Sequence, residues 1–156
     1  MLEEFFENIS IIDIQRTGAS EMSIMFGHNN EETEYELYIE AMARITKGNR
    51  IILSQLDSWS LPEVEDKEGL KVMYDIILRD VIRPLLPLKV VKVTFSEIGD
   101  VELVLENDMR ISSFNSDSDN SEQWRIFDNA ADKQYVFKNY EIHTAAINRE
   151  FDDMFD

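Results

Sequence analysis

The segment from Asp66 to Pro84 constrains the fold most, because it is the one long stretch of this chain with a helical pattern. Apolar residues recur in it at spacings of three and four, which places them on one side of an α-helix. These residues are Leu70, Met73, Ile77 and Val81. Other apolar residues widen the stripe, so the helix must be covered on more than one side. With Asp66 as N-cap and Pro84 as terminator, the sequence predicts a central, largely buried helix over about residues 66–84.

The segments on both sides of this helix have the alternating pattern of β-strands. The most regular runs from Thr33 to Thr46, where apolar residues alternate with polar ones at a period of two. We expect a single strand there, whose outward face carries Glu34, Glu36, Tyr38 and Glu40. Near the C-terminus, the residues from Thr144 onward favour a helix instead.

The strand patterns before and after the helix follow the same order, which predicts an internal duplication. The matched segments are 9–16 with 89–96, 21–26 with 101–106, 35–39 with 109–113, 43–45 with 124–126, and 50–53 with 134–137. The predicted fold class is α+β, with two similar antiparallel β-units bridged by the central helix. A chain of 156 residues with 44% hydrophobic content fits one domain over residues 1–156, with halves at about 9–57 and 88–142.

The two halves differ by an insertion. Leu37 and Arg44 are seven positions apart, whereas Ile111 and Arg125 are fourteen apart. The extra residues form a segment rich in serine and acidic residues, and loops inserted into a repeat are favoured places for function. We predict a partner-binding site there, formed by Asp117, Asp119 and Glu122, with Trp124 anchoring its end. The acidic face of strand 33–46 is the alternative site, and Tyr38 joins the first site if the two are adjacent.

The charge balance favours a basic partner. The chain has 32 acidic and 15 basic residues, a formal net charge of −17 and a pI of about 4.4. Such a charge repels nucleic acid and anionic membranes and steers basic proteins, although it also serves solubility alone. There is no cysteine, the N-terminus is acidic, and no apolar run has the length of a membrane span. We therefore expect a cytoplasmic protein.

No residue pattern indicates a reaction, a metal or a cofactor. Asp117, Asp119, Ser121 and Asp128 occupy positions 1, 3, 5 and 12 of a calcium-loop count, but Glu122 stands where that loop needs glycine. The two histidines lack zinc-ligand spacing, and the acidic pairs lie in polar surroundings that do not raise a carboxylate pKa. We predict that the protein is not an enzyme and has no catalytic or metal-binding residues.

Two short motifs carry a resemblance. They are the Ala43-Arg44-Ile45 strand with its Gly48 hairpin, and the acidic segment followed by Trp124-Arg125-Ile126-Phe127. Together they resemble a group of small acidic bacterial immunity proteins encoded beside polymorphic toxins, over about residues 8–142. That group often has Trp before the first Arg-Ile, where this chain has Ala43, so any aromatic role is left to Trp124.

These observations predict a stoichiometric protein inhibitor of the immunity type, which binds and neutralises a cognate, basic bacterial toxin domain. Inhibition by binding needs no chemistry from the inhibitor. The alternative is an acidic nucleic-acid mimic, of the kind found in phages and mobile elements, that occupies a DNA- or RNA-binding enzyme. The two functions differ in the molecule that the protein displaces from its target: a nucleic-acid mimic displaces DNA or RNA from an enzyme, whereas an immunity protein blocks a toxin domain.

Overall fold

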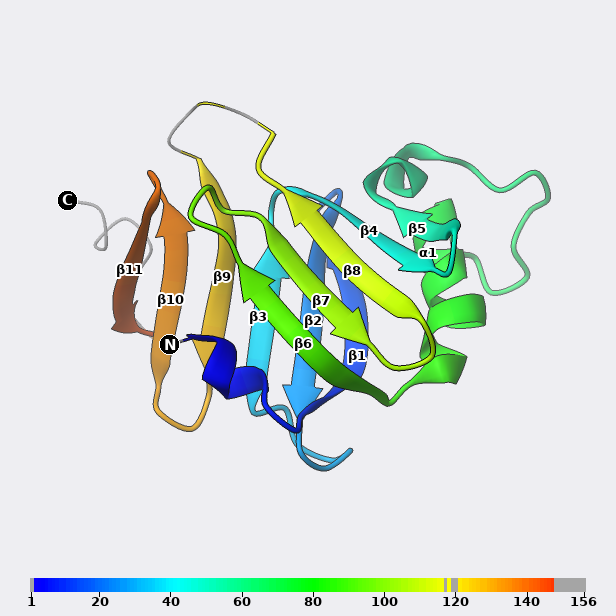
Figure 1. Ribbon diagram of the computed structural model, residues 1–156. Coiled ribbons are helices and arrows are strands. Elements are labelled where there is room, and N and C mark those ends of the chain that lie inside the picture. The colour runs from blue at the N-terminus through cyan, green and yellow to red at the C-terminus, as the bar shows by residue number, and fades with distance from the viewer. Residues whose placement is uncertain (1, 117, 119–120, 148–156) are drawn as a thin grey trace.

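The computed structural model describes residues 2–116, 118 and 121–147 (Figure 1). Its strands are β1 (Ser10–Thr17), β2 (Glu21–Gly27), β3 (Tyr35–Ile39), β4 (Met42–Lys47), β5 (Arg50–Ser54), β6 (Leu88–Phe95), β7 (Val101–Leu105), β8 (Met109–Phe114), β9 (Glu122–Asp128), β10 (Lys133–Lys138) and β11 (Glu141–Ala146). Its helical segments are η1 (Leu2–Phe6), η2 (Gln55–Trp59), α1 (Met73–Ile77), η3 (Leu78–Ile82) and η4 (Arg83–Leu85). The fold is α+β with a mostly sheet character.

All eleven strands follow one another in a single antiparallel order, β11-β10-β9-β3-β2-β1-β6-β7-β8-β4-β5. The joint between β1 and β6 is short, with Ser10 and Ile11 facing Lys89 and Leu88. Beyond this joint, β6, β7 and β8 cross in front of β1, β2 and β3, so the sheet folds into two layers (Figure 1). Phe95 of β6 contacts Trp124 of β9 across the layers, with ring centroids 4.8 Å apart.

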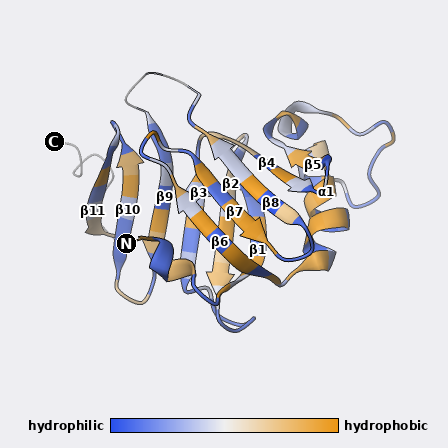
Figure 2. Cartoon of the chain, in the orientation of Figure 1, coloured by the Kyte–Doolittle hydropathy of each residue, from blue (hydrophilic) through white to orange (hydrophobic). Residues whose placement is uncertain are grey.

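The strands form because apolar residues alternate with polar ones, as Figure 2 shows along the front layer. In β7, Val101, Leu103 and Leu105 are buried, while the residues between them are partly exposed. The buried side chains of both layers and of the helical segments join in one core. A turn between β6 and β7 also packs closely, because a Cβ atom at Gly99 would lie 2.6 Å from Cε1 of Phe137.

The predicted strand over 33–46 is wrong as a single element. β3 ends at Ile39 and β4 begins at Met42, and these strands pair with β9 and β8, on opposite sides of the β1–β6 joint. The backbone N–H groups of Glu40 and Ala41 both donate to the carbonyl of Gln123, so the regular ladder is interrupted there. The alternation continues on both sides of the break, which is why the sequence pattern hides it.

The other predicted strands are confirmed, and the pairings between them follow a regular correspondence. Each of the strands β1 to β5 corresponds to the strand five numbers later, β6 to β10. Under this correspondence every pairing among these ten strands matches an observed pairing, and the β1–β6 pairing matches itself. Tyr38 faces Arg125 where β3 meets β9, and Ser112 faces Arg44 where β8 meets β4. Each half therefore pairs its fourth strand with the third strand of the other half, and its fifth strand follows on the outside.

The helical segment begins at Met73, seven residues later than the predicted start at Asp66. Gly69 has a positive φ of 81°, and Val72 is extended, so the backbone before Met73 is not helical. The buried residues of α1 and η3 are Tyr74, Leu78 and Ile82, at a spacing of four. Val81, part of the predicted stripe, is 42% exposed. The segment packs against β1, β5 and η2.

The C-terminal prediction is also wrong in part, because Thr144 to Ala146 belong to strand β11. This strand pairs with β10 over its whole length and adds a strand beyond the ten that correspond. The rest of the predicted C-terminal helix lies outside the described residues. In the part of the chain that the structure describes, no helix is long and apolar enough to cross a membrane.

Candidate functional site

The residues of the two predicted sites meet in a shallow hollow on the outward face of β3 and β9. The hollow has a volume of about 390 Å³ and is lined by Tyr38, Glu40, Glu122, Arg125 and Phe127. Alternation along β3 turns Leu37 and Ile39 into the core and leaves Tyr38 on the opposite face. The predicted condition for Tyr38 is met, because Glu122, at the end of the inserted segment, lies beside it. We call this the β3–β9 hollow.

Arg125 organises the β3–β9 hollow. Its guanidinium donates from Nε and Nη2 to the two carboxylate oxygens of Glu122, at 2.8 and 3.2 Å, and from Nη1 to Oε1 of Gln134 at 2.9 Å. It also lies 5.8 Å from the ring centroid of Phe127. The side chains of Arg125 and Glu122 are only 15% and 8% exposed, so this ion pair holds both side chains in place on one side of the hollow. Arg125 and Glu122 therefore form a largely buried ion pair.

Arg44, the matching position in the first half, makes a different contact. The Arg44 guanidinium lies 5.2 Å from the ring centroid of Phe114. Among the described residues, Arg44 forms no ion pair. The sequence placed the two arginines at equivalent positions but did not identify their partners.

Glu40 and Tyr38 interact at the rim of the β3–β9 hollow, where the Tyr38 hydroxyl donates to Oε1 of Glu40 at 3.3 Å. Desolvation and the nearby Glu122 carboxylate raise the pKa of Glu40 above its ordinary value. Desolvation and the charge of Glu40 also raise the pKa of Tyr38, so this phenol stays neutral and keeps its O–H donor. The hollow therefore offers an aromatic ring and a carboxylate that is poorly compensated.

The other predicted strand residues lie further along the same strand and already have partners. The Glu36 carboxylate accepts from the buried Ser23 hydroxyl. The Glu34 carboxylate accepts from the backbone N–H of His28 and lies 2.8 Å from Nδ1 of its ring. These contacts with His28 lower the pKa of Glu34, and the hydrogen bond from the backbone contributes most.

Of the described residues that were predicted to form a site in the inserted segment, only Glu122 lines the β3–β9 hollow. Asp117 and Asp119 lie outside the described residues. Trp124 is fully buried, on the face of β9 opposite to Arg125, with its ring between those of Phe95 and Phe137. The alternation of β9 turns Trp124 into the core, so it does not line the β3–β9 hollow, and its role as the anchor of the loop end stays a prediction.

The sequence analysis missed an exposed apolar segment over residues 56–64. Leu56, Trp59, Leu61 and Val64 are exposed by 65%, 60%, 77% and 79%. Large apolar side chains gathered on a surface are typical of interaction sites. The signal in the sequence was a run of large apolar residues between η2 and the helical segment, with no strand or helix pattern that would bury them.

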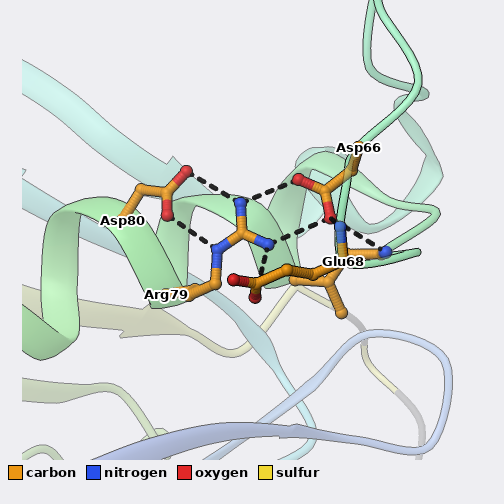
Figure 3. Close-up of polar contacts among 5 residues, drawn as sticks. Asp66, Glu68, Arg79 and Asp80 are labelled. Atoms are coloured by element: carbon orange, nitrogen blue, oxygen red, sulfur yellow. Dashed lines mark hydrogen bonds and ion pairs between the residues drawn. The ribbon is translucent and has the colours of Figure 1, made fainter.

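A network around Arg79 ties Asp66 and Glu68, in the loop that follows the 56–64 segment, to the helical segment, as Figure 3 shows. The guanidinium donates to both carboxylate oxygens of Asp66, at 2.8 and 3.0 Å, and also to Glu68 and Asp80. The Asp66 carboxylate also accepts from the backbone N–H groups of Glu68 and Leu70. The hydrogen bonds from Arg79 and from this backbone hold the pKa of Asp66 at about 2, so the network persists at neutral pH.

Within residues 2–116, 118 and 121–147, no three histidine, aspartate or glutamate side chains gather in a way that could hold a metal ion. The β3–β9 hollow can bind a cationic group through carboxylates and pack an apolar group on Tyr38 or Phe127. Comparison with protein-family models, with curated proteins and with solved structures finds no match.

Proposed function

We propose that this protein is an immunity protein, a stoichiometric inhibitor that binds and neutralises a basic toxin domain in the bacterial cytoplasm without turnover. The observation that carries the proposal is the β3–β9 hollow, in which Tyr38 lies beside the poorly compensated carboxylate of Glu40 on an open face. A tyrosine beside such a carboxylate suits a lysine or arginine of a partner. The net charge of −17 adds long-range attraction for a basic protein.

The exposed 56–64 segment adds further support for a binding role. Trp59 is of the type that most often dominates the energy of protein interfaces. The ion pairs of Arg79 with Asp66 and Glu68 fix the loop that follows the segment, and the Met73 backbone N–H donates to the carbonyl of Ser60 within it. A preorganised surface loses less conformational entropy on binding, which raises affinity.

The proposal is tested with the toxin domain encoded by the gene beside this one, by measuring association and dissociation rates against salt. Glu40→Gln should lower the association rate at low salt by about twofold and weaken its salt dependence, because steering loses one charge. Tyr38→Ala should raise the dissociation rate by about tenfold or more, as for a hot-spot side chain. Asp117→Asn/Asp119→Asn tests the inserted segment in the same way.

The matched control is Asp108→Asn, which removes one exposed charge from the turn between β7 and β8 and leaves a residue that tolerates its positive φ of 59°. Failure to bind or inhibit the neighbouring toxin would overturn the proposal. Competition with DNA or RNA for a nucleic-acid-binding enzyme would instead support the mimic. Equal effects of Asp108→Asn and Glu40→Gln would remove the hollow from the interface.

We also infer that the chain arose by duplication of a five-stranded unit, with halves at about 9–57 and 88–142 on either side of the central helical segment. The support is the corresponding strand pairings and the matching register of Tyr38 with Arg125 and Ser112 with Arg44. A chance β-meander has no reason to place both pairs in the same register.

A further inference from the structure

The inner faces of β10 and β11 extend beyond the second layer of strands, and no strand of the front layer covers them (Figure 1). Between these strands, η1 and the end of β6 lies a groove with a volume of about 1060 Å³. Six aromatic side chains line it: Phe5, Phe95, Trp124, Tyr135, Phe137 and Tyr140. We call it the aromatic groove. One of its walls is β11, the strand beyond the ten that correspond between the halves.

The aromatic groove has a rigid floor and an exposed edge. Trp124 packs against Phe95 and Phe137, with ring centroids 4.8 and 5.5 Å apart. At the edge, Tyr140 and Ile142 are 49% and 50% exposed. Trp124 itself is fully buried, so the surface that a ligand can reach comes from the other lining residues.

Among the described residues, those that line the aromatic groove and carry a charge are all acidic. Glu3, Glu4, Glu97 and Glu141 contribute to its lining. The described lining residues include no lysine, arginine or histidine. Aromatic faces are themselves electronegative and attract cations. The groove therefore combines apolar area with a preference for positive charge.

We propose that the aromatic groove binds an extended basic peptide segment of a protein partner. Apolar side chains and the aliphatic stems of lysine or arginine pack on the aromatic rings, while the cationic ends reach the glutamates at the rim. This inference does not rest on the function proposed above, because Trp124 and Arg125 point to opposite faces of β9. A toxin bound only at the β3–β9 hollow would leave the aromatic groove free.

Charge and size select this occupant over two others. A second copy of the chain would bring more carboxylates to the rim, since acidic residues outnumber basic ones by 32 to 15. A single small organic cation would fill little of about 1060 Å³, which lies at the upper end for small-molecule sites. A basic peptide supplies the apolar length and the cations together.

The test uses the full chain with Trp59→Phe, which leaves Trp124 as the only tryptophan and its fluorescence as the signal for the groove. The probe is the acetylated and amidated peptide Arg-Leu-Arg-Leu-Arg. The same peptide with citrulline in place of arginine has nearly the same shape and no charge. We expect saturable binding of the arginine peptide that weakens with added salt, and much weaker binding of the citrulline peptide.

Two pairs of variants with equal charge change locate the binding. Glu97→Gln/Glu141→Gln should lower the affinity for the arginine peptide by about three- to tenfold, as expected for two exposed charge contacts. Glu63→Gln/Glu65→Gln, in the exposed loop before the helical segment, should change affinity by less than about twofold, because these charges act only through screened long-range attraction. Tyr140→Ala should weaken binding by about fivefold, through loss of a cation–π and stacking surface.

Several results would overturn the proposal. They are equal binding of the two peptides, no saturable fluorescence change, or equal effects of the two glutamine pairs. Sedimentation that shows dimers blocked by Tyr140→Ala would assign the groove to a second copy. Peptide binding that appears only after deletion of residues 148–156 would assign it to the chain's own end. Saturation by spermine with no competition from the peptide would make it a small-cation site.

Discussion

Glu34 and Glu40 stand at the two ends of β3, yet the fold shifts their pKa values in opposite directions. His28 donates its backbone N–H to Glu34 and places its ring beside the same carboxylate, which lowers the pKa. Glu40 loses solvent and lies near the Glu122 carboxylate, which raises the pKa. The two glutamates are indistinguishable in the alternating sequence pattern, and only their neighbours separate them.

These shifts predict opposite effects of the same substitution. Ionised Glu40 opposes folding at neutral pH, so Glu40→Gln should raise the free energy of unfolding near pH 7, and the gain should disappear as the pH falls below about 4. Ionised Glu34 favours folding, so Glu34→Gln should lower stability near pH 7, and this loss should fade as the pH falls through its lowered pKa. Each effect should be about 0.5 kcal/mol, as is usual for exposed positions.

Urea unfolding of the wild type and both variants, at several pH values, measures these differences. The two variants act as controls for each other, because each replaces one carboxylate next to an end of β3 by an amide. Shifts of equal sign at neutral pH would mean that total charge, rather than the local contacts of each carboxylate, governs stability.

At the scale of elements, the helical segment shows how a local pattern was misassigned. The predicted stripe joined positions that do not form the buried row, because the segment starts at Met73 and continues through the π-helical turn η3. The observed row of Tyr74, Leu78 and Ile82 contacts the core, and the opposite side faces solvent at Asp80 and Val81. The helical segment therefore contributes one face to the core.

This row predicts which substitutions destabilise the fold. Leu78→Ala should cost about 3 kcal/mol, because Leu78 is only 1% exposed and its removal leaves a cavity. Val81→Ala, which also shortens an aliphatic side chain in η3, should cost less than about 1 kcal/mol, because Val81 is exposed. Equilibrium unfolding in urea compares the two, and a larger loss at Val81 would contradict the observed orientation of the segment.

At the scale of the whole molecule, each half completes the sheet of the other. β4 and β5 extend the sheet at β8, and β9 and β10 extend it at β3. A strand without its partner exposes both backbone groups and an apolar face. The exchange therefore makes the two halves one cooperative unit, although their strands follow the same order.

We predict that residues 1–64 and residues 65–156, expressed separately, do not fold alone, and that the intact chain unfolds in one transition. Mixing the two fragments should restore the β-sheet signal in circular dichroism, because each supplies the strands that the other lacks. A fragment of residues 1–64 that shows cooperative thermal unfolding by itself would contradict the exchange. The intact chain, cleaved at the exposed Val64, serves as the control for the cut itself.

The sequence by itself determined the features that depend on local periodicity and composition. Alternation located most strands and their repeated order, and the unequal spacings from Leu37 to Arg44 and from Ile111 to Arg125 pointed to the longer segment before β9. The acidic balance is a matter of composition alone. These signals are reliable because a strand that buries one face repeats every two residues, whatever its partners are.

Only the tertiary structure decided which strands meet and therefore which side chains share a site. The break at Glu40 and Ala41 leaves no trace in the alternation, yet it carries the chain from β3, beside β9, to β4, beside β8. The pairing of β3 with β9 places Tyr38 opposite Arg125, and the alternation of β9 turns Trp124 inward. The aromatic groove joins η1, β6 and β11, segments as far apart as Phe5 and Tyr140. Contacts between distant segments are set by pairing and layer packing, which no local pattern encodes.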